Sequence, residues 1–281
     1  MNFIKMEGLS NDFIITHEVN EKDIPAIQNQ FVKLCDRRRG IGADGIIFVL
    51  KSDTCDFKMR IFNSDGSEPE MCGNGIRCFA LYVNLLQLSK LNKLSVETLA
   101  GKIITELDEN KRVTVNMGAP KLHAADIPVA EGSGPVLMKP LCIENKEFRI
   151  TCVSMGNPHT VIYPEGELAD DLVLGFGPKI ETNKFFPRKT NVEFIKILSP
   201  KEIQMRVWER GCGETQACGT GACASVVSGI INGLHEKSVT VHLPGGDLDI
   251  SWSGEEHDPV LMTGPANMVF QGSVQIEGNN N

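Results

Sequence analysis

An internal repeat is the feature that most constrains how this 281-residue chain can fold. The segment MCGNGIRCFALYV, which begins at Met71, resembles ACGTGACASVVSG, which begins at Ala217. Both read Cys-Gly-polar-Gly and continue into an apolar run with helical spacing, and their first cysteines, Cys72 and Cys218, are offset by 146 residues (218 − 72). Self-similarity at a fixed offset predicts two structural units of the same kind.

The same offset relates residues elsewhere in the chain without gaps. Downstream, LSVETLAGKIITEL resembles VTVHLPGGDLDISW as a strand, a small-residue turn and a second strand, with a slip of about one residue of the kind that loops tolerate. Matches at one offset along so much of the chain argue against chance. The matched pairs are Asn11 and Asn157, Gly45 and Asn191, Asn63 and Glu209, and Gly118 and Gly264.

Hydrophobic periodicity predicts an α/β chain of the α+β type, rich in strands, with one central helix in each unit. Helical spacing is clearest over residues 75–88 and 221–234, and weaker patterns cover 25–36 and 170–180. We predict a first lobe over residues 1–118 and a second over 119–264, with a strand in 265–281 that returns to the first lobe. Runs typical of strands cover 13–16, 46–50, 58–62, 94–98, 112–116, 160–163, 192–197, 204–208, 239–243 and 269–275.

Charge and cysteine spacing exclude several classes of function. The net charge of −8, from 28 Lys and Arg against 36 Asp and Glu, argues against a nucleic-acid partner, because phosphate binding needs a basic face. The chain has no secretory pattern at its start and no apolar run long enough to span a membrane, so we expect no membrane partner and a cytoplasmic location. The nine cysteines contain no CxxC pair, which argues against a metal or redox site.

Each Cys-Gly-polar-Gly turn places a cysteine at the start of a predicted helix. A helix N-terminus carries unpaired N–H groups and the positive end of the helix dipole. Both favour the thiolate, so we expect Cys72 and Cys218 to have a pKa below the ordinary value of about 8.5. The remaining cysteines are interpreted as small apolar residues, except Cys212, which has no repeat partner and is interpreted only as non-catalytic.

Two such turns facing one another would suit inversion of a carbon stereocentre. The N–H groups of Gly73, Asn74, Gly219 and Thr220 would bind one carboxylate. One cysteine would remove the proton from the adjacent carbon and the other would return a proton to the opposite face, while the N–H groups stabilise the charge that develops on the carboxylate. The repeat therefore predicts an epimerase or racemase that uses two cysteines.

These residues carry a resemblance to a known family. The sequence resembles the diaminopimelate epimerases over nearly its whole length, in the segments MEGLSNDF, RRRGIGADG, FNSDGSEPEMCGNGIRC, SMGNPH, NVEF, WERGCGETQACGTGACA and LPGG. The resemblance implies two pseudo-symmetric lobes, each a sheet or barrel wrapped around a central helix. It also implies conversion of LL-diaminopimelate to the meso isomer in lysine biosynthesis, without pyridoxal phosphate, metal or other cofactor, by a homodimer.

The resemblance assigns roles to further residues. It implies that Cys72 and Cys218 are the catalytic cysteines, assisted by His159 and Glu209, and that Gly73, Asn74, Gly219 and Thr220 bind the carboxylate at the reacting end. The sequence departs from the family at Gly45, where some members have Gln, and at Cys212, where many have a smaller or aliphatic residue. The residues that the resemblance places around the substrate are Asn11, Asn63, Asn157, Asn191, Glu209 and Arg210.

Three other interpretations compete with this one. A proline or hydroxyproline racemase would share the fold and the cysteines, but its substrate has no second amino-acid end. Such a substrate would not require the set Asn63, Asn191, Glu209 and Arg210. A thiol redox or metal-binding protein would use the cysteine-rich segment 212–223, which lacks the usual spacing. An inactive relative acting as a binding module would have lost a cysteine, and both are present.

Overall fold

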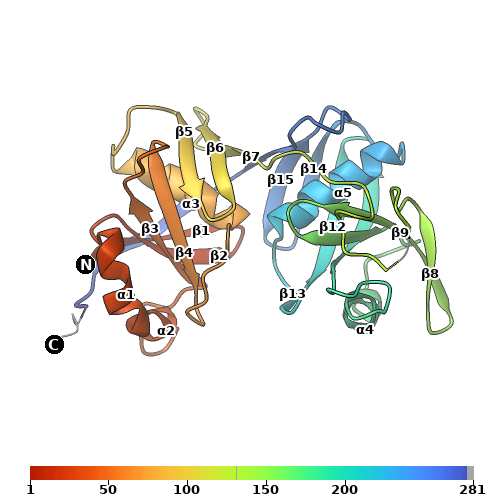
Figure 1. The fold of residues 1–281 in the computed structure, drawn as a ribbon, viewed down its shortest axis with the longest axis horizontal. Helices are drawn as coiled ribbons and strands as arrows, with labels where there is room; N and C mark the ends of the chain where they lie inside the picture. The colour runs from red at the N-terminus through yellow and green to blue at the C-terminus, as the bar shows by residue number, and fades with distance from the viewer. Residues whose placement is uncertain (131, 277–281) are drawn as a thin grey trace. The chain divides into compact units, whose positions relative to one another are not determined.

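The computed structural model describes residues 1–130 and 132–276 and divides into two compact units, drawn in Figure 1. The first lobe comprises Met1–Val115 and Gly264–Asn281, and the second lobe comprises Asn116–Thr263. Residues 277–281 of the predicted returning segment lie outside the described residues. Within the described ranges, no helix is long and apolar enough to cross a membrane.

Strands of the first lobe wrap around one buried helix, α3 (Gly73–Leu85). The helix is buried on nearly all sides, as expected for an apolar helix enclosed by other elements, and it contacts five surrounding strands. β17 returns from the end of the chain to pair antiparallel with β1. The strands are β1 (Asn2–Gly8), β2 (Asn11–Thr16), β3 (Gly45–Leu50), β4 (Phe57–Asn63), β5 (Lys93–Thr98), β6 (Gly101–Leu107), β7 (Val113–Asn116) and β17 (Asn267–Ser273).

The helix predicted over 25–36 is broken into short turns. They are η1 (Glu21–Asp23), α1 (Ile24–Ile27), η2 (Gln28–Gln30) and α2 (Phe31–Cys35). The tight 3₁₀ turn η2 consists of polar residues and lets both Ile27 and Phe31 reach the same apolar cluster. There the ring of Phe31 lies 4.9 Å from that of Phe62, so packing rather than helical propensity sets the local conformation.

The second lobe repeats the plan around α5 (Gly219–Ile231), which contacts four strands. A further helix, α4 (Asp170–Glu181), packs against β11 and β12, where the sequence has only a weak helical pattern. The strands are β8 (Lys139–Ile143), β9 (Lys146–Ser154), β10 (Pro158–Ile162), β11 (Asn191–Ser199), β12 (Glu202–Glu209), β13 (Gly213–Glu214), β14 (Ser238–Leu243), β15 (Gly246–Ser251) and β16 (Leu261–Gly264).

Residues related by the sequence repeat occupy equivalent positions in paired strands of the two lobes. In the first lobe β2 and β3 run parallel with Phe13 opposite Gly45, and in the second lobe β10 and β11 run parallel with His159 opposite Asn191. Both members of the second pair lie 146 residues after those of the first (159 − 13 and 191 − 45). The predicted α+β fold, with two related lobes each built around a central helix, is confirmed.

Candidate active site

The two predicted cysteines occupy the same position in their lobes. Cys72 is the N-cap of α3, with its sulfur 3.4 Å from the backbone N of Gly75, and Cys218 is the N-cap of α5, with its sulfur 3.4 Å from the backbone N of Gly221. Each sulfur therefore accepts a hydrogen bond from the first turn. The N–H groups of the first helical residues, predicted to bind a carboxylate, have no intrahelical acceptor by position.

In the first lobe, the Cys72 thiol contacts the neutral amide of Asn11. The thiol donates to Asn11 Oδ1 at 3.7 Å, and Asn74 Nδ2 donates to the same oxygen at 3.4 Å. Asn11 Nδ2 in turn donates to Asp44 Oδ2 at 2.8 Å. Three of the predicted site residues, Asn11, Cys72 and Asn74, are thus brought together at the N-terminus of α3.

Asp44, which accepts a hydrogen bond from Asn11, belongs to a network of charged side chains. Arg37 donates to both carboxylate oxygens of Asp12, at 2.9 and 2.8 Å, and to Asp44 at 2.8 Å, and Lys5 forms an ion pair with Asp12 at 2.8 Å. Burial acts to raise the pKa of Asp12, but the hydrogen bonds from Arg37 and Lys5 outweigh it and hold that pKa well below its usual range. Arg37 therefore has a specific structural role.

Arg77 fixes the start of α3 to the returning chain. This fully buried guanidinium donates to Pro265 O at 3.0 Å, to Gly73 O at 3.1 Å and to Asn74 Oδ1 at 3.0 Å. It thereby holds the turn that carries Cys72 against the segment leading into β17. The contact also orients the Asn74 amide.

The remaining predicted positions of the first lobe lie at the ends of strands. Asn63 is exposed at the end of β4, and its Nδ2 donates to Ser67 Oγ at 3.0 Å. Gly45 lies in β3 opposite Asn63, and a β-carbon at Gly45 would come within 2.6 Å of Phe62 O. The departure from the family at Gly45 is therefore a matter of close backbone packing.

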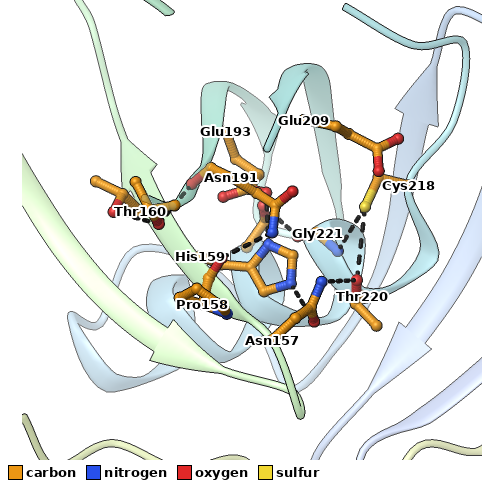
Figure 2. Close-up of polar contacts among 12 residues, drawn as sticks. Asn157, Pro158, His159, Thr160, Asn191, Glu193, Glu209, Cys218, Thr220 and Gly221 are labelled. Carbon is orange, nitrogen blue, oxygen red and sulfur yellow. Dashed lines mark hydrogen bonds and ion pairs between the residues drawn. The ribbon is translucent and has the colours of Figure 1, made fainter. Parts of the chain in front are cut away.

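In the second lobe, a chain of polar side chains leads to Cys218, as Figure 2 shows. Cys218 lies 3.5 Å from Thr220 Oγ1, and Asn157 Nδ2 donates to Thr220 Oγ1 at 3.3 Å. His159 Nε2 lies 2.9 Å from Asn157 Oδ1, and His159 Nδ1 lies 2.7 Å from Glu193 Oε1. The predicted residues Asn157, His159, Cys218 and Thr220 are thus brought together.

Asn191 links two segments of this site. Its Nδ2 donates to Pro158 O at 2.8 Å, and its Oδ1 accepts from the backbone N of Arg210 at 2.9 Å. Only 3% of Asn191 is exposed, so its amide serves here to position its neighbours. The Arg210 side chain is exposed and donates to Arg188 O at 3.4 Å.

Burial and two nearby carboxylates shift the pKa of the Cys218 thiol in the direction opposite to the predicted one. Burial raises the pKa of this thiol well above its ordinary value, and Glu209 and Glu193 raise it further, outweighing the hydrogen bonds from Thr220 and Gly221. Burial also raises the pKa of Glu209, although hydrogen bonds with Thr215 and Cys218 act in the opposite direction. The prediction of a lowered pKa is therefore wrong for Cys218, because the sequence pattern showed the helix terminus but neither the burial of the thiol nor the acidic side chains beside it.

Two carboxylates of the second lobe escaped the sequence analysis. Glu193 lies in the quoted segment NVEF, where an acid within an apolar strand is a usable signal. Glu181, in α4, accepts from Trp208 Nε1 at 2.8 Å and from the backbone N of Gly211 at 3.0 Å, so it holds the turn that carries Glu209 and Arg210. No local pattern distinguishes Glu181. Cys212, also on that turn, is exposed, and its backbone N donates to Glu209 O at 3.1 Å.

Solved structures with this fold include a probable proline racemase, a hydroxyproline epimerase and a protein of the phenazine biosynthesis PhzF family. A probable proline racemase from Agrobacterium radiobacter superposes with a TM-score of 0.69 at 11% identity, covering 99% of this chain and 94% of that one. A hydroxyproline epimerase from Agrobacterium vitis gives 0.67 at 13% identity, over 98% and 90%. A PhzF-family protein from Bacillus anthracis gives 0.67 at 16% identity, over 98% and 99%. The fold places this chain in a class of two-lobed α+β proteins with one central helix in each lobe.

Sequence comparison identifies the family within that class. The diaminopimelate epimerase family model matches residues 3–123 and 151–269. A diaminopimelate epimerase from Moorella thermoacetica is 50% identical over 284 residues, which cover 99% of this chain and 100% of that protein. Another, from Pelotomaculum thermopropionicum, is 51% identical over 280 residues, covering 97% and 98%. The chain belongs to the diaminopimelate epimerase family.

Proposed function

We propose that this protein interconverts LL-diaminopimelate and meso-diaminopimelate with Cys72 and Cys218 as the two acid–base residues and with no cofactor. The observation that carries this mechanism is the identical placement of the two cysteines as N-caps of repeat-related helices, in a chain of this family. One substrate carbon would be reached by both helix N-termini. The first cysteine, as thiolate, takes the α-proton, so that a C–H bond breaks and an S–H bond forms.

The second cysteine completes the inversion from the opposite face. The electron pair left on the α-carbon is shared with the carboxylate, which the N–H groups of Gly73, Asn74, Gly219 and Thr220 stabilise. The thiol of the other cysteine then gives its proton to the carbon and becomes the thiolate. The raised pKa of Cys218, caused mainly by burial, favours its thiol form in the ligand-free protein.

The second amino-acid end of the substrate would be held by residues beyond the reacting carbon. Arg210 offers a guanidinium fork for a carboxylate, Glu209 offers a carboxylate for an ammonium group, and the amides of Asn63, Asn157 and Asn191 can donate and accept. His159 and Glu209 would assist proton handling by the cysteines. A proline-type substrate remains the second candidate, favoured only by the fold of the neighbours.

We further propose that the enzyme works in the cytoplasm, in lysine biosynthesis, as a homodimer. Met268, Val269 and Phe270 of β17 keep 44%, 55% and 43% of their surface exposed. Consecutive apolar residues on an exposed strand favour association, and a second copy of the same strand would cover them. Sedimentation of the full chain would show a dimer, and Val269→Lys would shift it to monomer. A wild-type monomer at micromolar concentration would contradict the homodimer.

The experiment that tests the reaction follows deuterium. The reduced protein is incubated with LL-diaminopimelate in D₂O, beside Cys72→Ala and Cys218→Ala, with Cys142→Ala as an exposed-cysteine control. We expect meso product with deuterium at the α-carbon from the wild type and the control, and loss of both product and label in the two active-site variants. A folded, reduced wild type without product or exchange would overturn the assignment, and proline and hydroxyproline would be tried next.

A further inference from the structure

Glu193 is a fully buried acid in the middle of strand β11. Its Oε1 lies 2.7 Å from His159 Nδ1, and both side chains have no exposed surface. Its other oxygen, Oε2, has no hydrogen-bond partner within the described residues. Burying a carboxylate in this way is costly, and an unpaired oxygen adds to the cost.

In the first lobe, apolar side chains occupy the positions equivalent to Glu193 and His159. The repeat places Ile47 where the second lobe has Glu193, and Phe13 where it has His159, and both are buried. A β-carbon at Gly75 would lie 3.0 Å from Ile47 Cδ1, and one at Gly221 would lie 2.9 Å from Glu193 Oε1, so the two side chains press on the same turn of the two central helices. The fold itself therefore does not require an acid at this position.

The hydrogen-bond geometry shows what the acid can do. The Asn157 amide presents its oxygen to His159 and its nitrogen to Thr220 (Figure 2). Because Asn157 Oδ1 only accepts, His159 Nε2 must carry a proton to make this contact. The contact between Nδ1 and Glu193 then holds a second proton, on either atom, and fixes the plane of the imidazole ring.

We propose that Glu193 is a positioning residue of the reaction: through His159 it fixes the Asn157 amide beside Thr220 and Cys218, in the second lobe only. This inference rests on the proposed function for its kinetic test. The role acts through a chain of three contacts, Glu193 to His159, His159 to Asn157 and Asn157 to Thr220, which ends 3.5 Å from the Cys218 sulfur. Asn157 is an amide, so the chain orients groups and does not relay protons.

Two substitutions of Glu193 separate orientation from simple packing. Glu193→Gln keeps a donor for His159 Nδ1, so we expect kcat within about threefold of the wild type. Glu193→Leu removes the carboxylate that contacts His159 Nδ1. We expect kcat to fall by about ten- to a hundredfold, as for other residues that orient a functional group, with KM changed less than about threefold. Thr160→Val is the matched control, since it removes a buried hydrogen bond of 3.0 Å to Thr190 from β10, the strand that carries His159, and should leave kcat unchanged.

A double-mutant cycle tests whether the effect passes through His159. His159→Phe with Glu193→Ile gives the second lobe the side chains of the first, so this pair should fold, as a thermal unfolding curve would show. We expect its kcat to equal that of His159→Phe alone. Multiplied losses, a Glu193→Gln variant as slow as Glu193→Leu, or a fully active Glu193→Leu would each overturn the positioning role.

Nuclear magnetic resonance can measure the orientation of the Asn157 amide independently of catalytic activity. The side-chain amide signal of Asn157 should coincide in the wild type and Glu193→Gln and should move in Glu193→Leu. An unmoved signal in Glu193→Leu would overturn the inference even if the wild type proved inactive on diaminopimelate. Failure of the proposed function would instead appear as wild-type inactivity together with the expected movement of this signal.

Discussion

The sulfur of Cys218 lies 3.5 Å from Thr220 Oγ1, two residues further along the same turn. The equivalent residue of the first lobe, Asn74, directs its amide to Asn11, which itself accepts from the Cys72 thiol. The two turns have the same backbone conformation, with a cysteine as the N-cap of a helix. Their electrostatic surroundings differ, because Glu209 and Glu193, beside burial, raise the pKa of Cys218. Pseudo-symmetry of the chain is therefore not symmetry of the chemistry.

This difference predicts how Cys218 reacts in the ligand-free protein. Because its pKa is raised, alkylation of Cys218 by iodoacetamide should begin at a higher pH than alkylation of the exposed Cys142. Glu209→Gln removes one cause and should move the onset for Cys218 to lower pH, while the onset for Cys142 stays in place. Mass spectrometry of peptides after timed labelling measures both onsets. Equal onsets in the wild type would contradict the raised pKa of Cys218, and an unmoved onset in Glu209→Gln would contradict the role of that carboxylate.

The network behind Asn11 predicts how stability depends on pH. The pKa of Asp12 is lower in the folded protein than in the unfolded chain, so its contribution is present above the unfolded value of about 4 and is lost as the pH falls through the folded value. Asp12→Asn should lower the free energy of unfolding by about 2 kcal/mol at pH 7, and by less under acid conditions. Urea titrations at several pH values measure this, with the exposed Asp53→Asn as control. A deficit that grows toward low pH would show the opposite sign.

Glycine at position 45 should be needed for packing. Gly45→Ala would place its β-carbon 2.6 Å from Phe62 O, a backbone atom that cannot move alone, so we expect a loss of about 1–3 kcal/mol in unfolding free energy. Gly175→Ala is the matched control, because nothing lies within 4 Å of its β-carbon and it is in a helix, where alanine stabilises by about 0.5–1 kcal/mol. Thermal melts that rank the two variants in the reverse order would refute the packing argument.

Glu181 should matter for substrate binding without contacting substrate. Glu181→Ala removes the acceptor of Trp208 Nε1 and of the Gly211 backbone, and so loosens the turn that carries Glu209 and Arg210. We expect KM for diaminopimelate to rise by about tenfold, because an orienting contact is lost. Steady-state kinetics beside Glu181→Gln, which keeps one acceptor oxygen, should show a smaller increase. Unchanged KM in the alanine variant would mean that the turn holds its shape unaided.

Sequence patterns predicted much of the fold where side chains alternate or repeat. Both central helices were predicted within three residues of their observed limits, since their apolar runs follow the Cys-Gly turns. Strand β1 was missed because the buried Lys5, which pairs with Asp12, interrupts its apolar run. Strand β9 was missed because its second half is buried on both faces and so lacks alternation.

The candidate site was predictable to the extent that it is local. Cys72 and Cys218 stand out because the repeat marks them. The contact of Glu193 with His159 joins residues 34 positions apart, on strands whose parallel pairing no local pattern specifies. The direction of the pKa shift at Cys218 was predicted wrongly for the same reason, since the burial of the thiol and the nearby carboxylates Glu209 and Glu193 depend on strands distant in the sequence.

The pairing of β1 with β17 gives the first lobe an unusual place in the order of synthesis. Its first strand precedes the second lobe in the chain, yet the partner of that strand, which spans Asn267–Ser273, is made after the whole second lobe. The second lobe, Asn116–Thr263, is continuous in sequence and can fold as soon as it has emerged. Until β17 has been made, the edge of β1 that pairs with it stays unpaired. The first lobe is therefore completed after the second lobe, although most of its strands precede the second lobe in the chain.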